Sequence, residues 1–192
     1  MAEMKSNKGR PALPEGLAVE LYMDPVSERR ALDLRKAVYA GGITPVLGLM
    51  NDRPHISLAV FPGIRPEKLI ELTAAFAKKV SPLEFQLSAV GVFPTPDNVL
   101  FLYPVPTPQL LAIHAEYHFM LENAGILSGE YYRPGNWVPH CTLEIGITST
   151  DLRKAVQICK KGMIPIRGMT ASIGLVSFRP IEYLVQFQLE GN

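Results

Sequence analysis

The sequence predicts an α+β fold in which one strand–helix–strand–helix–strand unit occurs twice. Two observations predict it. Apolar strand patterns alternate with helical spacing along the chain, and the landmarks of the first half return in the second. His140 lies 85 positions after His55, and Phe178 lies 85 positions after Phe93. Equal offsets across an intervening helix and strand indicate a tandem, pseudo-symmetric duplication.

The first repeat covers about residues 17–97. Strands are expected at 17–23, from His55 onward, and from 83 to the "AVGVF" that ends at 93, with helices at 25–40 and 65–80. The pair Gly41 and Gly42 suits the end of the first helix. In the second helix, Pro66 suits the first turn, and Lys78 and Lys79 complement the dipole at the last turn.

The second repeat covers about residues 98–180 and has the same order of elements. "VLFLYPV" from 99 resembles "LAVELYM" from 17, and a helix from about 108 to 123 closes on "NAGI" where the first copy closed on "AGGI". "PHCTLEI" parallels "PHISLAV", a helix is expected at 151–161, and the next strand ends at Phe178. A final strand at 181–190 completes the chain.

The composition is that of an ordinary globular protein. The chain has 192 residues, 47% of them hydrophobic and 19% charged, and a net charge of +1. This charge argues against an extended nucleic-acid interface, and no apolar run is long enough for a membrane span. The two unpatterned cysteines fit a reducing compartment, so we expect a cytoplasmic protein. Residues 1–16 are expected to be a flexible tail, followed by a single domain at 17–192.

The two histidines share a local pattern that places a hydroxyl beside each ring. Side chains alternate between the faces of a strand, so His55 and Ser57 share one face, and His140 and Thr142 share the same face of their own strand. A pseudo-twofold relation between the repeats could bring both pairs to one cleft.

Two imidazoles and two hydroxyls suit the cleavage of a phosphodiester. Histidine titrates near neutral pH, so one ring can accept a proton from a nucleophile while the other donates one to a leaving oxygen. The hydroxyls of Ser57 and Thr142 can hold phosphoryl oxygens without a metal ion. Cyclic phosphates are favoured substrates, because ring opening needs a base on one side and an acid on the other.

The tetrapeptides "HISL" from His55 and "HCTL" from His140 resemble the paired motifs of the 2H phosphoesterase superfamily, the group of the 2′-5′ RNA ligase-like (LigT-like) proteins and cyclic phosphodiesterases. The resemblance covers nearly the whole chain after the tail. It implies a bilobal fold in which two antiparallel-rich sheets face a central cleft, with helices outside. It also implies hydrolysis of 2′,3′-cyclic phosphates without metal or cofactor, with His140 as the base that activates water and His55 as the acid.

The partner expected from the resemblance is an RNA 3′ end or a small cyclic-phosphate nucleotide, bound by a monomer. Two alternatives stay open: a binding module that holds such a ligand without turnover, and 2′-5′ RNA ligation in the same cleft. Beside the motifs, Tyr132 and Trp137 could stack on a base, and Arg53 and Arg133 could contact phosphate. The aromatic residues could equally anchor a long loop on the core, and a rim arginine such as Arg53 could equally be a solvated charge.

Two other patterns, a histidine pair and a cysteine after His140, are incomplete as functional motifs. His114 and His118 are four apart on a predicted helix, a spacing that suits a metal, but the sequence shows no third ligand and lacks the Glu that a metalloprotease motif needs after the first histidine. Cys141 follows His140 as in phosphatase loops, but the arginine expected six positions later is Ile147, and the strand pattern turns Cys141 toward the core.

Overall fold

The structure, a computed structural model, describes residues 15–96, 98–161 and 164–191. The elements of the first half are β1 (Gly16–Met23), α1 (Pro25–Ala40), β2 (His55–Pro62), α2 (Pro66–Lys79) and β3 (Glu84–Phe93). The second half has β4 (Val99–Pro104), α3 (Pro108–Asn123), the short 3-10 helix η1 (Glu130–Tyr132), β5 (Cys141–Glu144), α4 (Ser149–Lys160) and β6 (Ile166–Phe178). The last strand is β7 (Glu182–Gln188). The α+β class and the order of the predicted elements are confirmed.

Local signals in the sequence explain where the helices begin and end. Asp24 caps α1 by accepting hydrogen bonds from the backbone N–H groups of Val26 and Ser27, each at 3.0 Å. Thr107 caps α3 and Thr148 caps α4 in the same way. After α1 and α3, Gly42 and Gly125 have φ values of 86° and 71°, a region that favours glycine.

The strands form one seven-stranded sheet, in the order β2-β1-β6-β3-β4-β5 with β7 paired to β6. The prediction of two sheets is therefore wrong in one respect: β6 is long enough to belong to both halves. Its residues 166–169 pair with β3, and its residues 170–178 pair with β1. Every pairing in the sheet is antiparallel.

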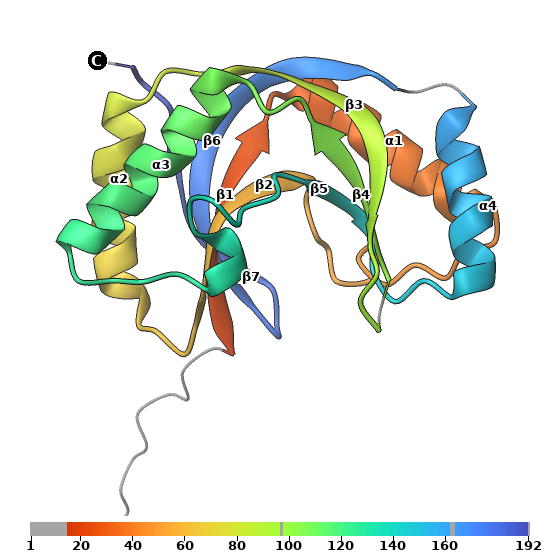
Figure 1. Cartoon of the computed structure of the whole chain (residues 1–192), viewed down its shortest axis with the longest axis horizontal. Helices are drawn as coiled ribbons and strands as arrows, with labels where there is room; N and C mark the ends of the chain where they lie inside the picture. Colours follow the sequence, from red (N-terminus) through yellow and green to blue (C-terminus); the bar gives the residue numbers. More distant parts are fainter. Residues whose placement is uncertain (1–14, 97, 162–163, 192) are drawn as a thin grey trace, which may run out of the picture.

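The third strand of each predicted repeat pairs with the first strand of the other. β3 lies next to β4, and β6 lies next to β1. The helices cross over as well: α1 packs against α4, and α2 packs against α3. Figure 1 shows β6 as an arch over the molecule, with α2 and α3 outside one limb and α1 and α4 outside the other.

The sheet separates a helix-covered face from an inner face. Alternate residues of β1, such as Leu17, Val19 and Leu21, belong to the hydrophobic core, as do Ile56 and Leu58 of β2. The residues between them, including His55 and Ser57, lie on the opposite face, as predicted. The inner face of the arch therefore carries the polar side chains that the motifs supply.

No helix in the described ranges has the length and apolarity that a bilayer crossing requires. The predicted tail lies outside the described residues as far as position 14, and β1 already begins at Gly16. Position 97, between β3 and β4, is also outside the described residues.

Candidate active site

His55, the first residue of β2, has a fixed ring orientation. Its Nδ1 lies 2.7 Å from the carbonyl oxygen of Arg53. A carbonyl can only accept a hydrogen bond, so Nδ1 carries the hydrogen and Nε2 is the nitrogen left for chemistry. Nε2 in turn lies 3.3 Å from Oε1 of Glu20, a β1 side chain that is almost fully buried.

His140 immediately precedes β5 and is held in the same way. Its Nδ1 lies 2.8 Å from the carbonyl oxygen of Val138, again two residues upstream, so Nε2 is again the free nitrogen. Its other neighbours differ from those of His55. The ring of Phe93 meets it edge-on with centroids 4.9 Å apart, and the ring of Phe101 lies at 5.4 Å.

The two environments move the pKa values of the two rings in opposite directions. Burial lowers the pKa of His140, and the charge of His55 lowers it further, although the bond to Val138 opposes this. Burial opposes protonation of His55 too, but the charges of Glu20 and Asp52 outweigh it and raise the pKa of His55. The arrangement therefore favours the neutral form of His140 and the protonated form of His55.

The motif hydroxyls have no hydrogen-bond partner among the described residues. Ser57 is nearly buried on β2, and Thr142 is half-buried on β5. Within the described part of the chain, neither hydroxyl makes a hydrogen bond, although the carbonyl of each residue does: Ser57 accepts from Trp137 Nε1, and Thr142 accepts from Arg35. Both side chains are therefore free to donate to phosphoryl oxygens.

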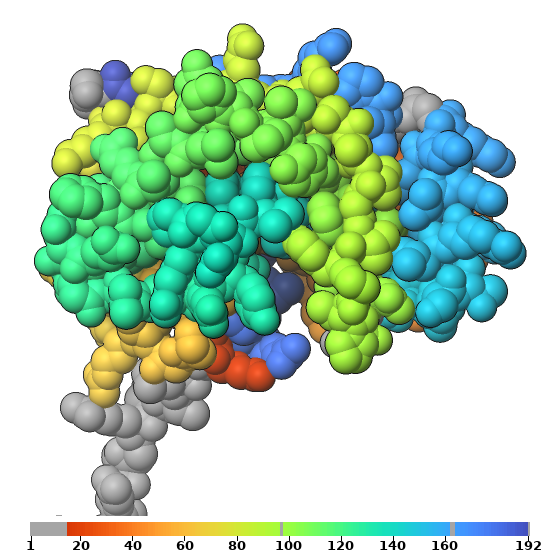
Figure 2. Space-filling view, viewed as in Figure 1, coloured from red at the N-terminus to blue at the C-terminus, as the bar shows by residue number. Residues whose placement is uncertain are grey.

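A cavity of about 650 Å³ opens beside His140. Its lining includes four of the predicted site residues: Tyr132, Trp137, His140 and Thr142. The other lining residues are Phe93, Pro94, Thr95, Val99, Tyr131, Asn136, Val138 and Ile145. Figure 2 shows the surface hollowed between the turquoise segment that leads to β5 and the yellow-green hairpin of β3 and β4. His55 and Ser57 do not line this cavity, so it extends from the second motif only.

The two predicted arginine contacts are engaged elsewhere. Arg53 makes a paired interaction with Glu28, at 2.9 and 3.0 Å, and its guanidinium lies 4.4 Å from the ring centroid of Tyr22. Arg133 donates from Nε to the carbonyl of Ser128 and does not line the cavity. Both residues hold loop segments in this structure, whereas the alternative expected for a rim arginine was a solvated charge.

The carboxylates near His55 were not predicted from the sequence. Glu20 touches Nε2, and Asp52 Oδ1 lies 3.8 Å from Nδ1. For Glu20 a signal was present, because it is an acidic residue inside the otherwise buried strand "LAVELYM". Charged side chains are rarely buried without a partner. The position of Glu20 in a buried strand therefore indicated a hydrogen-bonded or charged partner.

His114 and His118 both contact backbone carbonyl oxygens through their rings. Both are 3% exposed, and their Nε2 atoms lie 2.8 Å from the carbonyl of Tyr132 and 3.1 Å from the carbonyl of Leu58. His114 also stacks on Trp137, with centroids 3.9 Å apart and planes 1° apart. In the described residues, no three His, Cys, Asp or Glu side chains are grouped to bind a metal ion.

Cys141 faces the core, as predicted. It is fully buried, and burial raises the pKa of its thiol to about 12. A thiol in this environment stays protonated at neutral pH and is a poor nucleophile.

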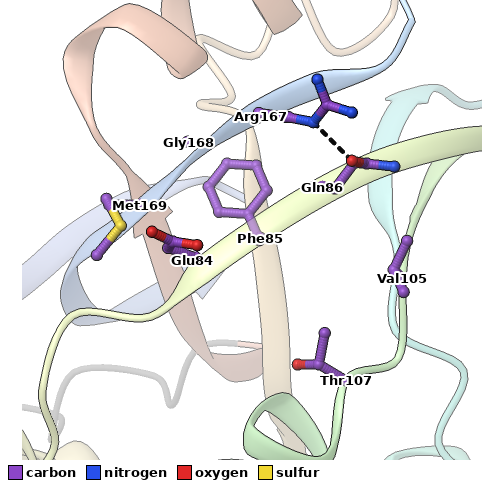
Figure 3. A pocket seen from close by; sticks show the side chains of 8 residues that line it. All are labelled: Glu84, Phe85, Gln86, Val105, Thr107, Arg167, Gly168 and Met169. Atoms are coloured by element: carbon purple, nitrogen blue, oxygen red, sulfur yellow. Dashed lines mark hydrogen bonds between the residues drawn. The ribbon is translucent and has the colours of Figure 1, made fainter.

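A second cavity, of about 630 Å³, lies away from both motifs. It is lined by Glu84, Phe85, Gln86, Val105, Thr107, Arg167, Gly168 and Met169. Figure 3 shows Arg167 of β6 bonded to Gln86 of β3 across its wall, at 2.7 Å from Nε to Oε1. Its lining, among the residues that the structure describes, contains no histidine, cysteine or serine, so the histidine site is the better candidate for catalysis.

Comparisons with known proteins agree with the fold and with the motifs. A family model described as the 2′-5′ RNA ligase superfamily matches residues 22–180, a range that includes both motifs. No functionally curated protein matches the sequence.

Several solved structures resemble this one along their whole length. TT0787 of Thermus thermophilus is 20% identical with a TM-score of 0.62, and the match covers 92% of this chain and 99% of that chain. LigT of E. coli, solved with 3′-AMP, is 16% identical with a TM-score of 0.61, covering 92% and 98%. LigT was also solved with NADP+ and with ATP. Usb1 of Kluyveromyces marxianus is 11% identical with a TM-score of 0.55, covering 92% and 99%.

Proposed function

Because the chain belongs to the 2′-5′ RNA ligase superfamily, the LigT-like 2H phosphoesterases, we propose that it hydrolyses 2′,3′-cyclic phosphates of RNA ends or nucleotides. The observation that carries the proposal is that the two histidine rings are held by equivalent hydrogen bonds to backbone carbonyls. Each ring donates from Nδ1 to a carbonyl two residues upstream, and this leaves both Nε2 atoms for proton transfer. The effect of the His55 charge on His140 supports their action on one phosphoryl group.

The proposed reaction needs one base and one acid. Nε2 of neutral His140 takes a proton from water as the water oxygen attacks phosphorus. One ring P–O bond breaks, its electron pair stays on the ribose oxygen, and Nε2–H of His55 protonates that oxygen. Ser57 and Thr142 hold the non-bridging oxygens through their free hydroxyls. No step in this scheme requires a metal ion.

The cavity beside His140 supports a nucleotide as the ligand. Its lining is aromatic and apolar with a few neutral polar groups, and Asp, Glu, Lys and Arg are absent from the lining residues that the structure describes. Such a surface suits a nucleobase, which stacks on Tyr or Trp rings. The complexes of LigT with 3′-AMP, NADP+ and ATP support the same class of ligand for this chain.

Hydrolysis of a 2′,3′-cyclic nucleotide by the wild type and by His55→Ala and His140→Ala tests the proposal. Each substitution should lower kcat/KM by about 10²–10⁴-fold, because each removes one proton-transfer group. Cys141→Ala is the matched control: it changes the second motif without touching the proposed chemistry. Circular dichroism should show all variants folded. Equal turnover by wild type and both histidine variants would refute the assignment.

Two other activities are separable in the same assay. RNA ligation, which the family name favours, would use an RNA 5′-hydroxyl in place of water and leave a 2′-5′ linkage resistant to a 3′-5′-specific nuclease. A pure binding module would bind the cyclic nucleotide by calorimetry and leave it intact. Turnover with water as the acceptor distinguishes the proposed phosphodiesterase from both.

A further inference from the structure

The two halves of the site differ most at one pair of equivalent positions. In β1, Glu20 is registered with Ser57, directly after a shift in the register. In β4, Phe101 is registered with Thr142, also directly after a register shift. The first histidine therefore faces a carboxylate where the second faces an aromatic ring.

The geometry between Glu20 and His55 requires a proton. Nδ1 of His55 already carries a hydrogen for the Arg53 carbonyl, so a neutral ring would present a lone pair at Nε2. That lone pair would face Oε1 of Glu20 at 3.3 Å, an acceptor facing an acceptor. Glu20 is 5% exposed, so water is poorly placed to separate the charges. The pair is favourable only with a proton between the two atoms. Burial raises the pKa of Glu20 as well, so either group can hold this proton, and the titration of His55 distinguishes the two arrangements.

We propose that Glu20 is a positioning residue that keeps a proton on Nε2 of His55 for delivery to the leaving oxygen. The proposal rests on the proposed function for its role in turnover. On arrival of the substrate, the leaving oxygen replaces Oε1 of Glu20 as the acceptor. The P–O bond breaks as the proton moves from Nε2 to that oxygen, and the neutral His55 regains a proton from solvent beside the carboxylate.

The other charged groups around His55 have partners of their own. Asp52 is bonded to Arg35 at 2.9 Å, and Arg53 is bonded to Glu28 at 2.9 Å. The titratable and charged groups that face the pair are Tyr22 from β1, Glu28 and Arg35 from α1, Asp52 and Arg53 from the loop before β2, Tyr132 from η1, His140, and Tyr183 from β7. Among the acidic ones, Glu20 alone contacts Nε2, and Asp52 lies on the Nδ1 side.

The direct test is the titration of His55 by NMR in ¹⁵N-labelled wild type, Glu20→Gln and Glu144→Gln. Gln has the shape of Glu, but its amide can donate to Nε2 and stabilise the neutral ring. We expect the proton affinity of His55 to fall at least tenfold in Glu20→Gln. Glu144 is the matched control: it is also buried, but its carboxylate accepts from the backbone of Leu47 and Ile145. Glu144→Gln should leave the titration of His55 unchanged.

Kinetics then tests whether this proton is the one transferred. The alkaline limb of the kcat/KM profile should move to lower pH in Glu20→Gln by the same amount as the NMR titration, whereas a merely structural change would scale the whole profile. An unmoved titration, or a moved titration with an unmoved limb, would overturn the proposal. If Glu20→Gln fails to fold, a wild-type His55 that is neutral at pH 7 would overturn it. Absence of turnover by the wild type would refute the proposed function and leave the titration to decide the role of Glu20 in protonation.

Discussion

In the proposed mechanism the hydroxyl of Thr142 binds a phosphoryl oxygen near His140. Thr142 lines the cavity, and its hydroxyl makes no hydrogen bond within the described residues. Thr142→Val keeps the shape of the side chain and removes the donor. A hydrogen bond to a charged group contributes about 1.5–3 kcal/mol, so kcat/KM for a 2′,3′-cyclic nucleotide should fall roughly 10- to 100-fold.

Thr142→Ser supplies the control for that prediction. It keeps the hydroxyl on the same strand position, and the first motif already uses serine at Ser57. Its kcat/KM should stay within a few-fold of wild type. A valine variant as active as the serine variant would remove the hydroxyl from the proposed mechanism.

The residues of the site differ in how far the sequence could predict them. His55, His140 and their hydroxyl partners follow from strand alternation and repetition, which are local rules. Glu20 lies 35 positions before His55 and meets it only through the pairing of β1 with β2. The role of Arg53 was open because the carboxylate that holds it, Glu28, lies on α1, and the role of Arg133 was open because its contact with the nearby Ser128 carbonyl depends on the shape of an irregular loop.

At the scale of elements, α1 joins the segments that carry the two motifs. Its Arg35, 3% exposed, donates to both the carbonyl and the carboxylate of Asp52, which stands three residues before His55. The same guanidinium donates to the carbonyl of Thr142 at 3.0 Å. A helix from the first half of the chain thus fixes the spacing between the first motif and the second.

Arg35→Met should lower the free energy of unfolding by about 3–5 kcal/mol, because it leaves the buried Asp52 without its partner. Urea unfolding at pH 7 measures this. Adding Asp52→Asn should recover part of the loss, since no unpaired charge then remains. Lys36→Met is the control: Lys36 is exposed and pairs with the exposed side chain of Asp33 at 3.6 Å, so its loss should change stability by less than about 1 kcal/mol. A loss of less than about 1 kcal/mol in Arg35→Met would contradict the prediction.

The positions of the helices and strands could be predicted from local patterns. The pairing of strands far apart in the sequence could not. Caps, prolines and glycines located the helices, and alternation located the strands. The pairing of β3 with β4 is local, since Phe93 is registered with Val99 across a short turn. Nothing in those patterns says that β6 pairs with β1, because that pairing joins residues far apart in sequence. The boundary between the two repeats at about residue 97 stays a prediction from the sequence. The sheet itself is continuous, because β6 pairs with strands of both halves.

At the scale of the whole molecule, buried histidines in different environments make stability depend on pH in opposite directions. The raised pKa of His55 contributes stability at low pH that is lost as pH rises above its ordinary value of 6.5 through the folded value. The lowered pKa values of His114 and His118 have the reverse effect, since their neutral forms are favoured by folding. The molecule should therefore be most stable near neutral pH.

His114 should dominate the loss of stability on the acid side. Burial lowers the pKa of His114 to about 4, so below pH 6.5 the unfolded chain binds a proton that the folded chain excludes. This linkage removes about 2 kcal/mol between pH 7 and pH 5. His114→Gln should be less stable than wild type at pH 7, because the stacking on Trp137 is lost. Its stability should nevertheless decline by about 2 kcal/mol less over that range, as measured by urea unfolding. The exposed Glu116→Gln on the same helix should decline like the wild type, and parallel declines of wild type and His114→Gln would show that His114 does not exclude the proton.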